Sequence, residues 1–415
     1  MEKVFLVHDE VEYTYQKLIN DLNNKDFYLP TLYIGDNNPY EIFLLIIHSL
    51  IYGYSIEVLD GDFSESELKE IEFDTELLSV SKKIEEQLKI IDVKHLLNVI
   101  KENKNWELIL YTSGTTGRPK KVGHNLQTLT RNVKLHDKLK DDIWAFAYNP
   151  THMAGLQVFF QALMNQNTMI YTFGGQQRNV SNLIEKYKIT NISATSTFYR
   201  NVLPYLKDNI YQSIKRITFG GEKYDSSMEK AIKSIFPNAK IRNIYASTEA
   251  GSLFVAKGDI FEIPETIRGL IKFNESNELL IHQSLLANLD LYSLEDSWFK
   301  TGDLVEPTDD YHFKFISRKS DIINVGGYKV NPIEVENTIM KIPGIIDLLV
   351  KSKENRVTGH ILVVDIVKDE NADDMELKKL IKKFASEQLQ EWKIPRIIKF
   401  VDDIPRTRTG KKVRK

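Results

Sequence analysis

The sequence of 415 residues contains no cysteine. This absence excludes disulfide bonds, metal sites built on thiolates, and a catalytic cysteine nucleophile. It also agrees with a reducing compartment, so we expect a cytoplasmic protein.

The sequence also lacks an excess of charge of one sign, and it lacks long apolar runs. The 55 lysine and arginine residues face 58 aspartate and glutamate residues, which leaves a formal net charge of -3 and no global attraction to nucleic acid or an anionic membrane. The most apolar segment, 42–51, is far shorter than the about 20 residues that span a bilayer, so we expect a buried helix there. The N-terminus lacks the apolar core of a signal peptide. We therefore expect a small-molecule partner, no nucleic acid and no membrane span.

Short apolar runs alternate with helix-like patterns between Trp106 and Tyr245. This alternation predicts an α/β fold, in which a large N-terminal domain, residues 1–317, has mostly parallel sheets flanked by helices. Ligands in such sheets bind beyond the carboxyl ends of the strands. The expected strands are 108–111, 144–148, 168–173, 192–195, 217–219 and 241–245, with helices over 156–164 and 228–236.

The character of the sequence changes after Arg318. Asn331 and Pro332 are a typical helix start, and a strand over 361–367, a helix over 375–389 and a strand over 397–401 are expected after it. These elements predict a small α+β C-terminal domain, residues 318–415. The charged and polar segment 317–321 suits a hinge between the two domains.

The segment 111–120 combines hydroxyls, glycines and a lysine directly after an expected strand. Glycine lets the main chain approach an anion closely, hydroxyl and N–H groups donate hydrogen bonds, and lysine adds positive charge. A P-loop is excluded, because counting from Gly114 places Pro119 where its second glycine should be. By itself, the composition fits either a phosphate-binding loop or an ordinary surface loop.

Four further motifs follow in order. They are Tyr-Ala-Ser-Thr-Glu at 245–249, Phe-Lys-Thr-Gly-Asp-Leu at 299–304, Ser-Arg-Lys-Ser-Asp at 317–321 with Gly-Gly-Tyr at 326–328, and Pro-Arg-Thr-Arg-Thr-Gly-Lys at 405–411. Together with 111–120, they resemble the successive core motifs of the adenylate-forming enzymes: acyl- and aryl-CoA synthetases, nonribosomal peptide adenylation domains and firefly luciferase. Five motifs in register are far more specific than any one of them. The chain is closest in character to the acyl/aryl-CoA ligases, with a shortened N-terminal part.

The resemblance implies a two-step ligase reaction. Members of this family join a carboxylate to the α-phosphate of ATP, release pyrophosphate, and pass the acyl group to the thiol of CoA or of a phosphopantetheinyl carrier protein. Because one anion attacks another, the site must neutralise charge, so ATP and Mg²⁺ are the implied cofactors. The family also rotates its small domain about the hinge between the two half-reactions.

The resemblance also implies a role for each motif residue. Glu249 holds Mg²⁺, Thr248 contacts the α-phosphate, and Lys411 is the catalytic lysine. Asp303 contacts the ribose and Arg318 contacts the ribose or a phosphate, although either could be a surface ion-pair member. The β- and γ-phosphates are gripped by Thr112, Ser113, Gly114, Thr115, Thr116, Gly117 and Lys120, and the adenine is contacted by Tyr245, Gly220, Gly221 and Glu222.

The other assigned sites are the acid pocket and the thiol side. His152 lies at the mouth of the pocket and Thr195 in another wall, while Gly326, Gly327 and Tyr328 face the thiol. Segment 149–161 has no acidic residue to pair with a substrate amine, which favours an organic, aryl or short acyl acid over a free α-amino acid.

Three functions remain open at this point. The leading one is an AMP-forming acyl/aryl-CoA ligase, and the second is a stand-alone adenylating enzyme that loads an acyl carrier protein. The third is a non-catalytic nucleotide-binding regulatory module, against which the presence of Lys411, Glu249 and Asp303 together argues. Plain structural roles are the alternative for Tyr245 as a core residue and for Lys120 and Lys121 as solvated charges. We expect solvation to explain the basic tail residues Arg406, Arg408, Lys412, Arg414 and Lys415.

Overall fold

The computed structural model describes most of the chain. The described residues are 2–24, 28–30, 32–35, 38–61, 63, 68, 81–83, 88–103, 105–113, 119–174, 179–222, 224, 226–287, 294–356, 358–406 and 412–414. Only the main chain is described for residues 28, 29, 32–35, 60, 81–83, 112, 113, 119, 120, 294 and 295.

The chain folds into two compact units. The large unit comprises Met1–Lys272, Ile281–Phe299 and Asp309–Phe313, and the small unit comprises Phe273–Leu280, Lys300–Thr308 and Lys314–Lys415. The functional boundary that we expect at residue 318 stays a prediction.

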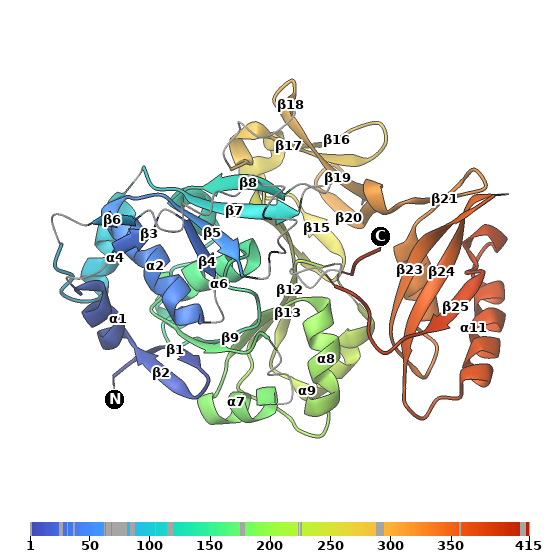
Figure 1. Cartoon of the computed structure of the whole chain (residues 1–415), viewed down its shortest axis with the longest axis horizontal. Coiled ribbons are helices and arrows are strands. Elements are labelled where there is room, and N and C mark those ends of the chain that lie inside the picture. Colours follow the sequence, from blue (N-terminus) through green and yellow to red (C-terminus); the bar gives the residue numbers. More distant parts are fainter. Residues whose placement is uncertain are drawn as a thin grey trace. The chain divides into compact units, whose positions relative to one another are not determined.

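A mostly parallel sheet forms the centre of the large unit (Figure 1). The strands from β13 to β1 all run parallel to their neighbours, whereas β14, β15 and β2 are antiparallel. In spatial order the strands are β15 (Ile260–Glu262), β14 (Gly251–Lys257), β13 (Lys240–Ser247), β12 (Arg216–Gly220), β11 (Asn191–Ala194), β9 (Ile143–Phe146), β10 (Thr168–Tyr171), β1 (Val4–His8) and β2 (Val11–Thr14).

Helices cover both faces of this sheet. One apolar cluster joins the sheet to α2 (Pro39–Tyr52) and α6 (Met153–Met164), and a second joins the opposite face to α7 (Val180–Tyr187), α8 (Ser196–Leu206) and α9 (Glu229–Ile235). Within β9, Phe146 belongs to the first cluster and Ala145 to the second, as the alternation of side chains along a strand requires. The parallel sheet is therefore buried on both faces, as such sheets normally are.

A second sheet of the large unit carries the start of the candidate phosphate loop. Its order is β4 (Leu32–Gly35), β5 (Ile56–Asp60), β7 (Leu108–Ser113) and β8 (Pro119–His124), with β8 antiparallel to β7. Pairing continues to the ends of both strands, so Ser113 lies opposite Pro119. The remaining elements of this unit are α1 (Tyr15–Leu22), β3 (Tyr28–Pro30), β6 (Ser81–Lys83), α4 (Val93–Glu102), α5 (Leu126–Thr130), η2 (Asp137–Leu139), η4 (Ser226–Met228), η5 (Glu265–Leu270), η6 (Gln283–Leu285) and β18 (Leu294–Glu295).

The small unit packs two helices against the sheet β23 (Ile345–Asn355), β24 (Gly359–Lys368) and β25 (Ile397–Phe400). Strand β24 is antiparallel to β23 and parallel to β25, and α10 (Pro332–Ile339) and α11 (Asp374–Gln388) share its apolar core. The Asn331 side chain caps α10 by accepting from the Ile333 N–H at 3.0 Å, as the sequence predicts. The remaining elements of the small unit are η8 (Lys319–Asp321), β21 (Ile323–Val325), β22 (Tyr328–Val330) and η9 (Glu391–Lys393). Four further strands have residues in both units: β16 (Ile271–Phe273), β17 (Glu278–His282), β19 (Trp298–Pro307) and β20 (His312–Arg318).

The predicted α/β class is confirmed. The expected strands from 108–111 to 241–245 overlap β7, β9, β10, β11, β12 and β13, and the segment 42–51 lies inside the buried helix α2. The sequence did not single out β1, β14 and β23.

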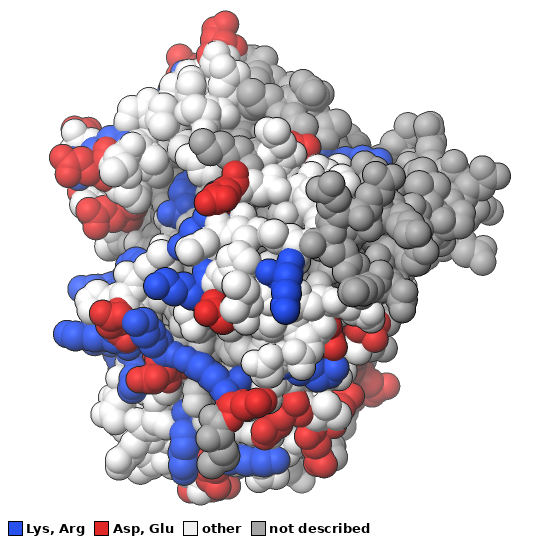
Figure 2. Space-filling model, turned by 90° about the vertical axis from the view of Figure 1, so that its left-hand side faces the viewer, with Lys and Arg blue, Asp and Glu red and all other residues white. Residues whose placement is uncertain are grey.

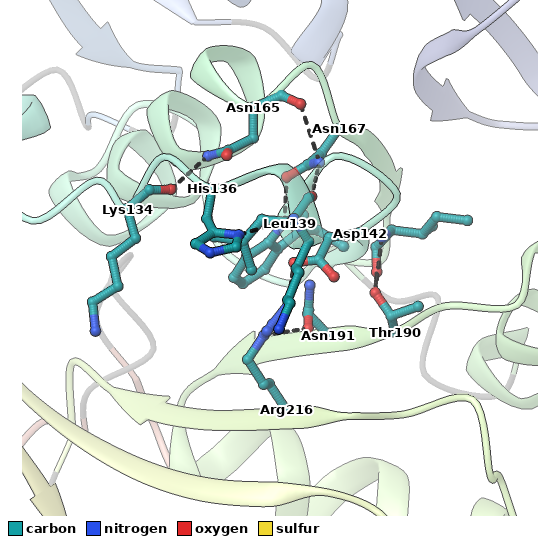
Figure 3. A network of polar contacts seen from close by, with 12 residues as sticks. Lys134, His136, Leu139, Asp142, Asn165, Asn167, Thr190, Asn191 and Arg216 are labelled. Carbon is teal, nitrogen blue, oxygen red and sulfur yellow. Dashed lines mark hydrogen bonds and ion pairs between the residues drawn. The ribbon is translucent and has the colours of Figure 1, made fainter.

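Polar contacts connect the amino-terminal ends of the parallel strands (Figure 3). Arg216, at the start of β12, donates to Asn191 Oδ1 at 2.9 Å and pairs with the buried carboxylate of Asp142. The Asn167 amide donates to the main-chain oxygen of Leu139 at 2.6 Å. Ligands of such sheets bind at the opposite edge, so we assign this network to stability.

We expect Asp142→Ala to lower the free energy of unfolding by about 2 kcal/mol, because the partly exposed Arg216 loses its charged hydrogen-bond partner at this edge. Urea unfolding measures the loss. Asp137→Ala is the control, since Asp137 and Lys140 form an ion pair in which both side chains are exposed. An equal loss in the two variants would contradict the importance of the buried pair.

Charged residues of both signs share the face drawn in Figure 2, where blue and red side chains are interspersed. This mixture agrees with the near balance of charge in the sequence. Within the described part of the chain, no helix has both the length and the apolar character needed to cross a membrane.

Candidate functional site

Several predicted site residues follow neighbouring parallel strands of the large unit. His152 follows β9, Thr195 follows β11, residues 220–222 end and follow β12, and residues 248–249 follow β13. Strands β9, β11, β12 and β13 are hydrogen-bonded neighbours in parallel register, so their carboxyl ends lie along one edge. The structure therefore brings these four segments to the edge where α/β sheets bind ligands.

The loop after β12 depends on its two glycines. A Cβ atom on Gly220 would lie 3.2 Å from the Tyr148 hydroxyl, and Gly221 has a φ of +80°, which disfavours other residues. A Cβ atom on Gly221 would lie 3.7 Å from Thr195 Cγ2. Gly220, Gly221 and Thr195 thus lie close together beyond the ends of β11 and β12.

The Glu222 carboxylate caps the N-terminus of α8. Its Oε2 accepts from the Thr197 N–H at 2.8 Å, and its Oε1 accepts from the Thr197 hydroxyl at 2.9 Å. A carboxylate at this end of a helix is stabilised by the unpaired N–H groups and the helix dipole. Glu222 therefore joins the β12 loop to the segment that begins at Thr195, while its predicted contact with adenine stays a prediction.

Thr248 and Glu249 lie in the tight turn between β13 and β14. Ser247 pairs with Gly251 across the base of this turn, and the Ala250 N–H donates to Ser247 Oγ at 3.2 Å. The Glu249 carbonyl accepts from the Ala287 N–H at 2.8 Å. The main chain of the turn is thus held by several partners, while the Thr248 and Glu249 side chains are half-buried.

Tyr245 lies on β13, just before this turn. Its ring is 8% exposed and packs against Phe254 and Phe261, with centroid distances of 5.4 and 6.1 Å. The ring is therefore part of the core, as the structural alternative required. Its contact with adenine stays a prediction.

The sequence did not point to His124, which ends β8. The ring is buried, and Nδ1 lies 3.3 Å from Thr128 Oγ1. Burial lowers the pKa of His124 to about 4, although the neighbouring main chain of Thr248 acts in the opposite direction. His124 is therefore a neutral side chain beside the Thr248 turn at physiological pH. Its position at a strand end after the candidate phosphate loop is the one signal that could have revealed it.

His152 precedes α6 and is placed by a tight turn. Asn149 Oδ1 accepts from the Thr151 N–H at 2.9 Å, and the Asn149 carbonyl accepts from the His152 N–H at 3.2 Å. A Cβ atom on Gly155 would lie 2.2 Å from the Asn149 oxygen, so only glycine fits there. This turn fixes the start of α6 at the carboxyl end of β9.

The candidate phosphate loop is described only at its ends. Gly114, Thr115, Thr116 and Gly117 lie outside the described residues, and Thr112, Ser113 and Lys120 are described by their main chain alone. Lys121 is exposed and belongs to a surface ion pair, in which its ammonium group lies 2.9 Å from Glu57 Oε2. The Tyr111 hydroxyl donates to the same carboxylate at 2.6 Å.

Asp303 and Arg318 form an ion pair in the small unit. Arg318 Nε lies 2.8 Å from Asp303 Oδ1, and Asp303 is only 1% exposed. The structure thus brings these two predicted ribose contacts together on β19 and β20. A buried carboxylate of this kind differs from the surface pair that was the structural alternative.

The Gly326-Gly327-Tyr328 segment is a tight turn between β21 and β22. Both glycines have positive φ angles, +59° and +90°, and the Gly327 N–H donates to Asn324 Oδ1 at 2.9 Å. The half-exposed Tyr328 ring stacks on Trp392 with a centroid distance of 4.3 Å. The turn and its aromatic pair belong to the small unit alone.

Comparison with known families agrees with this geometry. Residues 55–271 match the model of the AMP-binding enzyme family, and residues 334–411 match the AMP-binding enzyme C-terminal domain. The chain belongs to the AMP-binding enzyme family. The predicted membership of the adenylate-forming superfamily is therefore confirmed.

Curated relatives of this AMP-binding enzyme include 2-succinylbenzoate–CoA ligases. That of Listeria monocytogenes serotype 4b is 25% identical over 339 residues, which cover 74% of this chain and 70% of the relative. The Bacillus pumilus ligase is 23% identical and is matched over 99% of this chain and 93% of its own length.

Solved structures show the same fold. Bacillus subtilis MenE, an o-succinylbenzoate CoA synthetase in complex with the acyl-adenylate OSB-AMP, has a TM-score of 0.72 at 20% identity and covers 100% of this chain and 94% of its own. ATP-bound MatB from Rhodopseudomonas palustris has a TM-score of 0.75 at 16% identity, over 99% of this chain and 94% of its own.

The C-terminal tail of this AMP-binding enzyme corrects one prediction. Lys411, Arg408 and Lys415 lie outside the described residues, but Arg406, Lys412 and Arg414 are not solvated charges. All three side chains are less than 20% exposed and pair with buried carboxylates.

Two acidic side chains hold the described part of the tail. Asp347 on β23 pairs with Arg406 and, at 2.7 Å, with Lys412, while Arg406 and Lys412 face each other in an antiparallel bridge. Glu336 on α10 binds both terminal nitrogens of Arg414, one of them at 3.0 Å. The Val413 N–H also donates to the Pro405 oxygen at 2.9 Å. These contacts depend on residues far from the tail in the sequence, so charge composition could not reveal them.

We expect Asp347→Asn to speed amide hydrogen exchange at Val413 by about a hundredfold, because two half-buried cations lose their shared carboxylate and the bond to Pro405 opens more often. Mass spectrometry of the C-terminal peptide measures the rate. Asp365→Asn is the matched control, since Asp365 is equally buried but pairs with Lys351 in the same sheet. The same acceleration in both variants would contradict the inference that Asp347 specifically anchors the C-terminal tail.

Proposed function

We propose that this AMP-binding enzyme is an ATP-dependent acid–thiol ligase that adenylates a carboxylate and transfers the acyl group to CoA. The observation that carries the proposal is the convergence of residues 220–222, Thr195 and the Thr248–Glu249 turn along one edge of the sheet, in a chain of this family. Cytoplasmic localisation is part of the proposal and rests on the absence of cysteine.

The side chains at this edge suit ATP and Mg²⁺. Glu249 offers a half-buried carboxylate, and Mg²⁺ prefers oxygen ligands of this kind. When bound, Mg²⁺ supplies positive charge that offsets the repulsion between the substrate carboxylate and the phosphates. The hydroxyl group of Thr248, next to Glu249, would donate a hydrogen bond to an α-phosphate oxygen.

The remaining roles follow the motif assignments. Asp303, held by Arg318, would accept hydrogen bonds from the ribose hydroxyls, because a carboxylate is an acceptor only. Lys411 would stabilise the charge that develops on the carboxylate and α-phosphate oxygens during adenylation. Gly326, Gly327 and Tyr328 would serve the later step with the thiol.

The acceptor is CoA in this proposal, because the relatives named above are CoA ligases. Their acid, 2-succinylbenzoate, is an aryl carboxylate, and segment 149–161 offers no acidic side chain for a substrate amine. An aryl or other organic acid is therefore the proposed substrate class. Transfer to an acyl carrier protein is the alternative acceptor.

A screen of carboxylic acids for pyrophosphate release with ATP and Mg²⁺ tests the function. We expect aryl and keto-aryl acids to give release, and CoA to convert the adenylate to a thioester. A thioester formed with carrier proteins but never with CoA would favour the carrier alternative. ATP binding without release for any acid would favour a regulatory module.

We expect Lys411→Ala to slow acyl-adenylate formation by about a hundredfold or more, because a charge-stabilising group is lost from the transition state. Thioester formation from a preformed adenylate should stay close to the wild-type rate. Single-turnover assays of each half-reaction measure both rates, and Lys399→Ala, at an exposed lysine of the same unit, is the control. An equal loss in both half-reactions would contradict the assigned role.

A further inference from the structure

Arg131 contacts the Thr248–Glu249 turn from a distant part of the sequence. It follows α5, which comes directly after β8 and the candidate phosphate loop. Its Nη1 donates to the Ala250 oxygen at 3.3 Å, and its Nη2 donates to the Leu285 oxygen at 3.1 Å. One guanidinium group therefore joins the turn to the segment around Leu285.

The segment around Leu285 also makes a direct hydrogen bond to the Thr248–Glu249 turn. The Ala287 N–H donates to the Glu249 oxygen at 2.8 Å, two residues beyond the Leu285 oxygen that Arg131 binds. Arg131, the turn and residues 285–287 thus form a closed set of hydrogen bonds. Removal of Arg131 would release Ala250 directly and would loosen the segment that holds Glu249.

The side chain of Arg131 is suited to this role by its shape. A guanidinium group presents donors in a fixed planar fork, so it can bind two carbonyl oxygens on different segments at once. A lysine keeps the charge but is a single flexible point donor. Arg131 is half-buried, and this burial lowers the pKa of its guanidinium group.

We propose that Arg131 is a positioning residue for adenylation, which holds the Thr248–Glu249 turn so that Glu249 is presented to Mg²⁺ and Thr248 to the α-phosphate. The inference rests on the proposed function of this turn. Arg131 acts through main-chain oxygens and touches no reacting group. Because residues that orient a metal ligand strongly affect metal affinity, metal dependence is the property that should change.

The test measures ATP–pyrophosphate exchange against Mg²⁺ concentration in the full chain, with an acid identified by the screen. In Arg131→Gln, we expect the Mg²⁺ concentration for half-maximal rate to rise about tenfold, the range typical of lost orientation of a metal ligand. The KM for the acid should change less than about twofold, because His152 and Thr195 follow other strands, β9 and β11. An unchanged Mg²⁺ dependence would overturn the proposal.

Arg131→Lys separates geometry from charge. We expect it to resemble Arg131→Gln, because lysine cannot bind the Ala250 and Leu285 oxygens in the same way. A wild-type Mg²⁺ dependence in Arg131→Lys would show that a positive charge alone positions the turn. It would overturn the proposal that Arg131 acts by binding both carbonyl oxygens.

Asn132→Ala is the matched control. Asn132 is the next residue, and its Nδ2 donates to the Ser252 oxygen at 2.5 Å, in the same hairpin but beyond the turn. We expect this variant to lose some thermal stability and to keep the wild-type Mg²⁺ dependence. The same shift in Mg²⁺ dependence in both variants would show a general loosening of the hairpin and would overturn a specific role of Arg131.

A binding measurement keeps this test independent of turnover. The rise in melting temperature caused by ATP is measured with and without Mg²⁺. In Arg131→Gln, we expect the additional rise that Mg²⁺ gives to be lost. Retention of that additional rise would overturn the proposal. If the wild-type protein shows this Mg²⁺-dependent rise but no exchange with any acid, the ligase function fails while the role of Arg131 is still decided by the melting temperatures.

Discussion

Parallel hydrogen bonding among β9, β11, β12 and β13 is the constraint on which the candidate site depends. It places four polar segments that are far apart in the sequence along one edge of the sheet. The contacts at that edge are short-range and specific: Glu222 binds Thr197, and Ala287 binds Glu249. The opposite edge is fixed by Asp142 and Arg216, so the strands are held at both ends. Binding residues on loops thus rest on a rigid support.

The small unit repeats the kind of contact that Asp142 makes with Arg216, in which a buried carboxylate neutralises a cation from another segment. Asp303 pairs with Arg318, Asp347 with Arg406 and Lys412, and Glu336 with Arg414. A buried ion pair is expensive to break, because the remaining charge is left without a partner. These pairs therefore link β19 to β20, and they link the C-terminal tail to β23 and α10.

The sequence predicted what is encoded locally. Apolar runs indicated β7 and the strands from β9 to β13, but not β8, and Asn331 with Pro332 indicated the start of α10, because strand and cap signals extend over a few residues. Motif order indicated the family. The roles of Glu222, Arg131 and Asp347 were missed, since their partners lie 25, 119 and 59 positions away and no local pattern links them. The burial of Tyr245 likewise depends on Phe254 and Phe261 across the sheet.

The contact between Gly155 and the Asn149 oxygen has a consequence for how this protein could change its substrate during evolution. Any side chain at position 155 would need to displace the turn that sets the start of α6, so that position is closed to single substitutions. Thr195, a proposed pocket residue, also holds a structural position, because its hydroxyl oxygen caps α8 by accepting from the Phe198 N–H at 3.1 Å. On the proposed assignment of the acid pocket, a drift in acid preference would therefore proceed through His152 and its neighbours, while Gly155 and the turn at Asn149 stay unchanged.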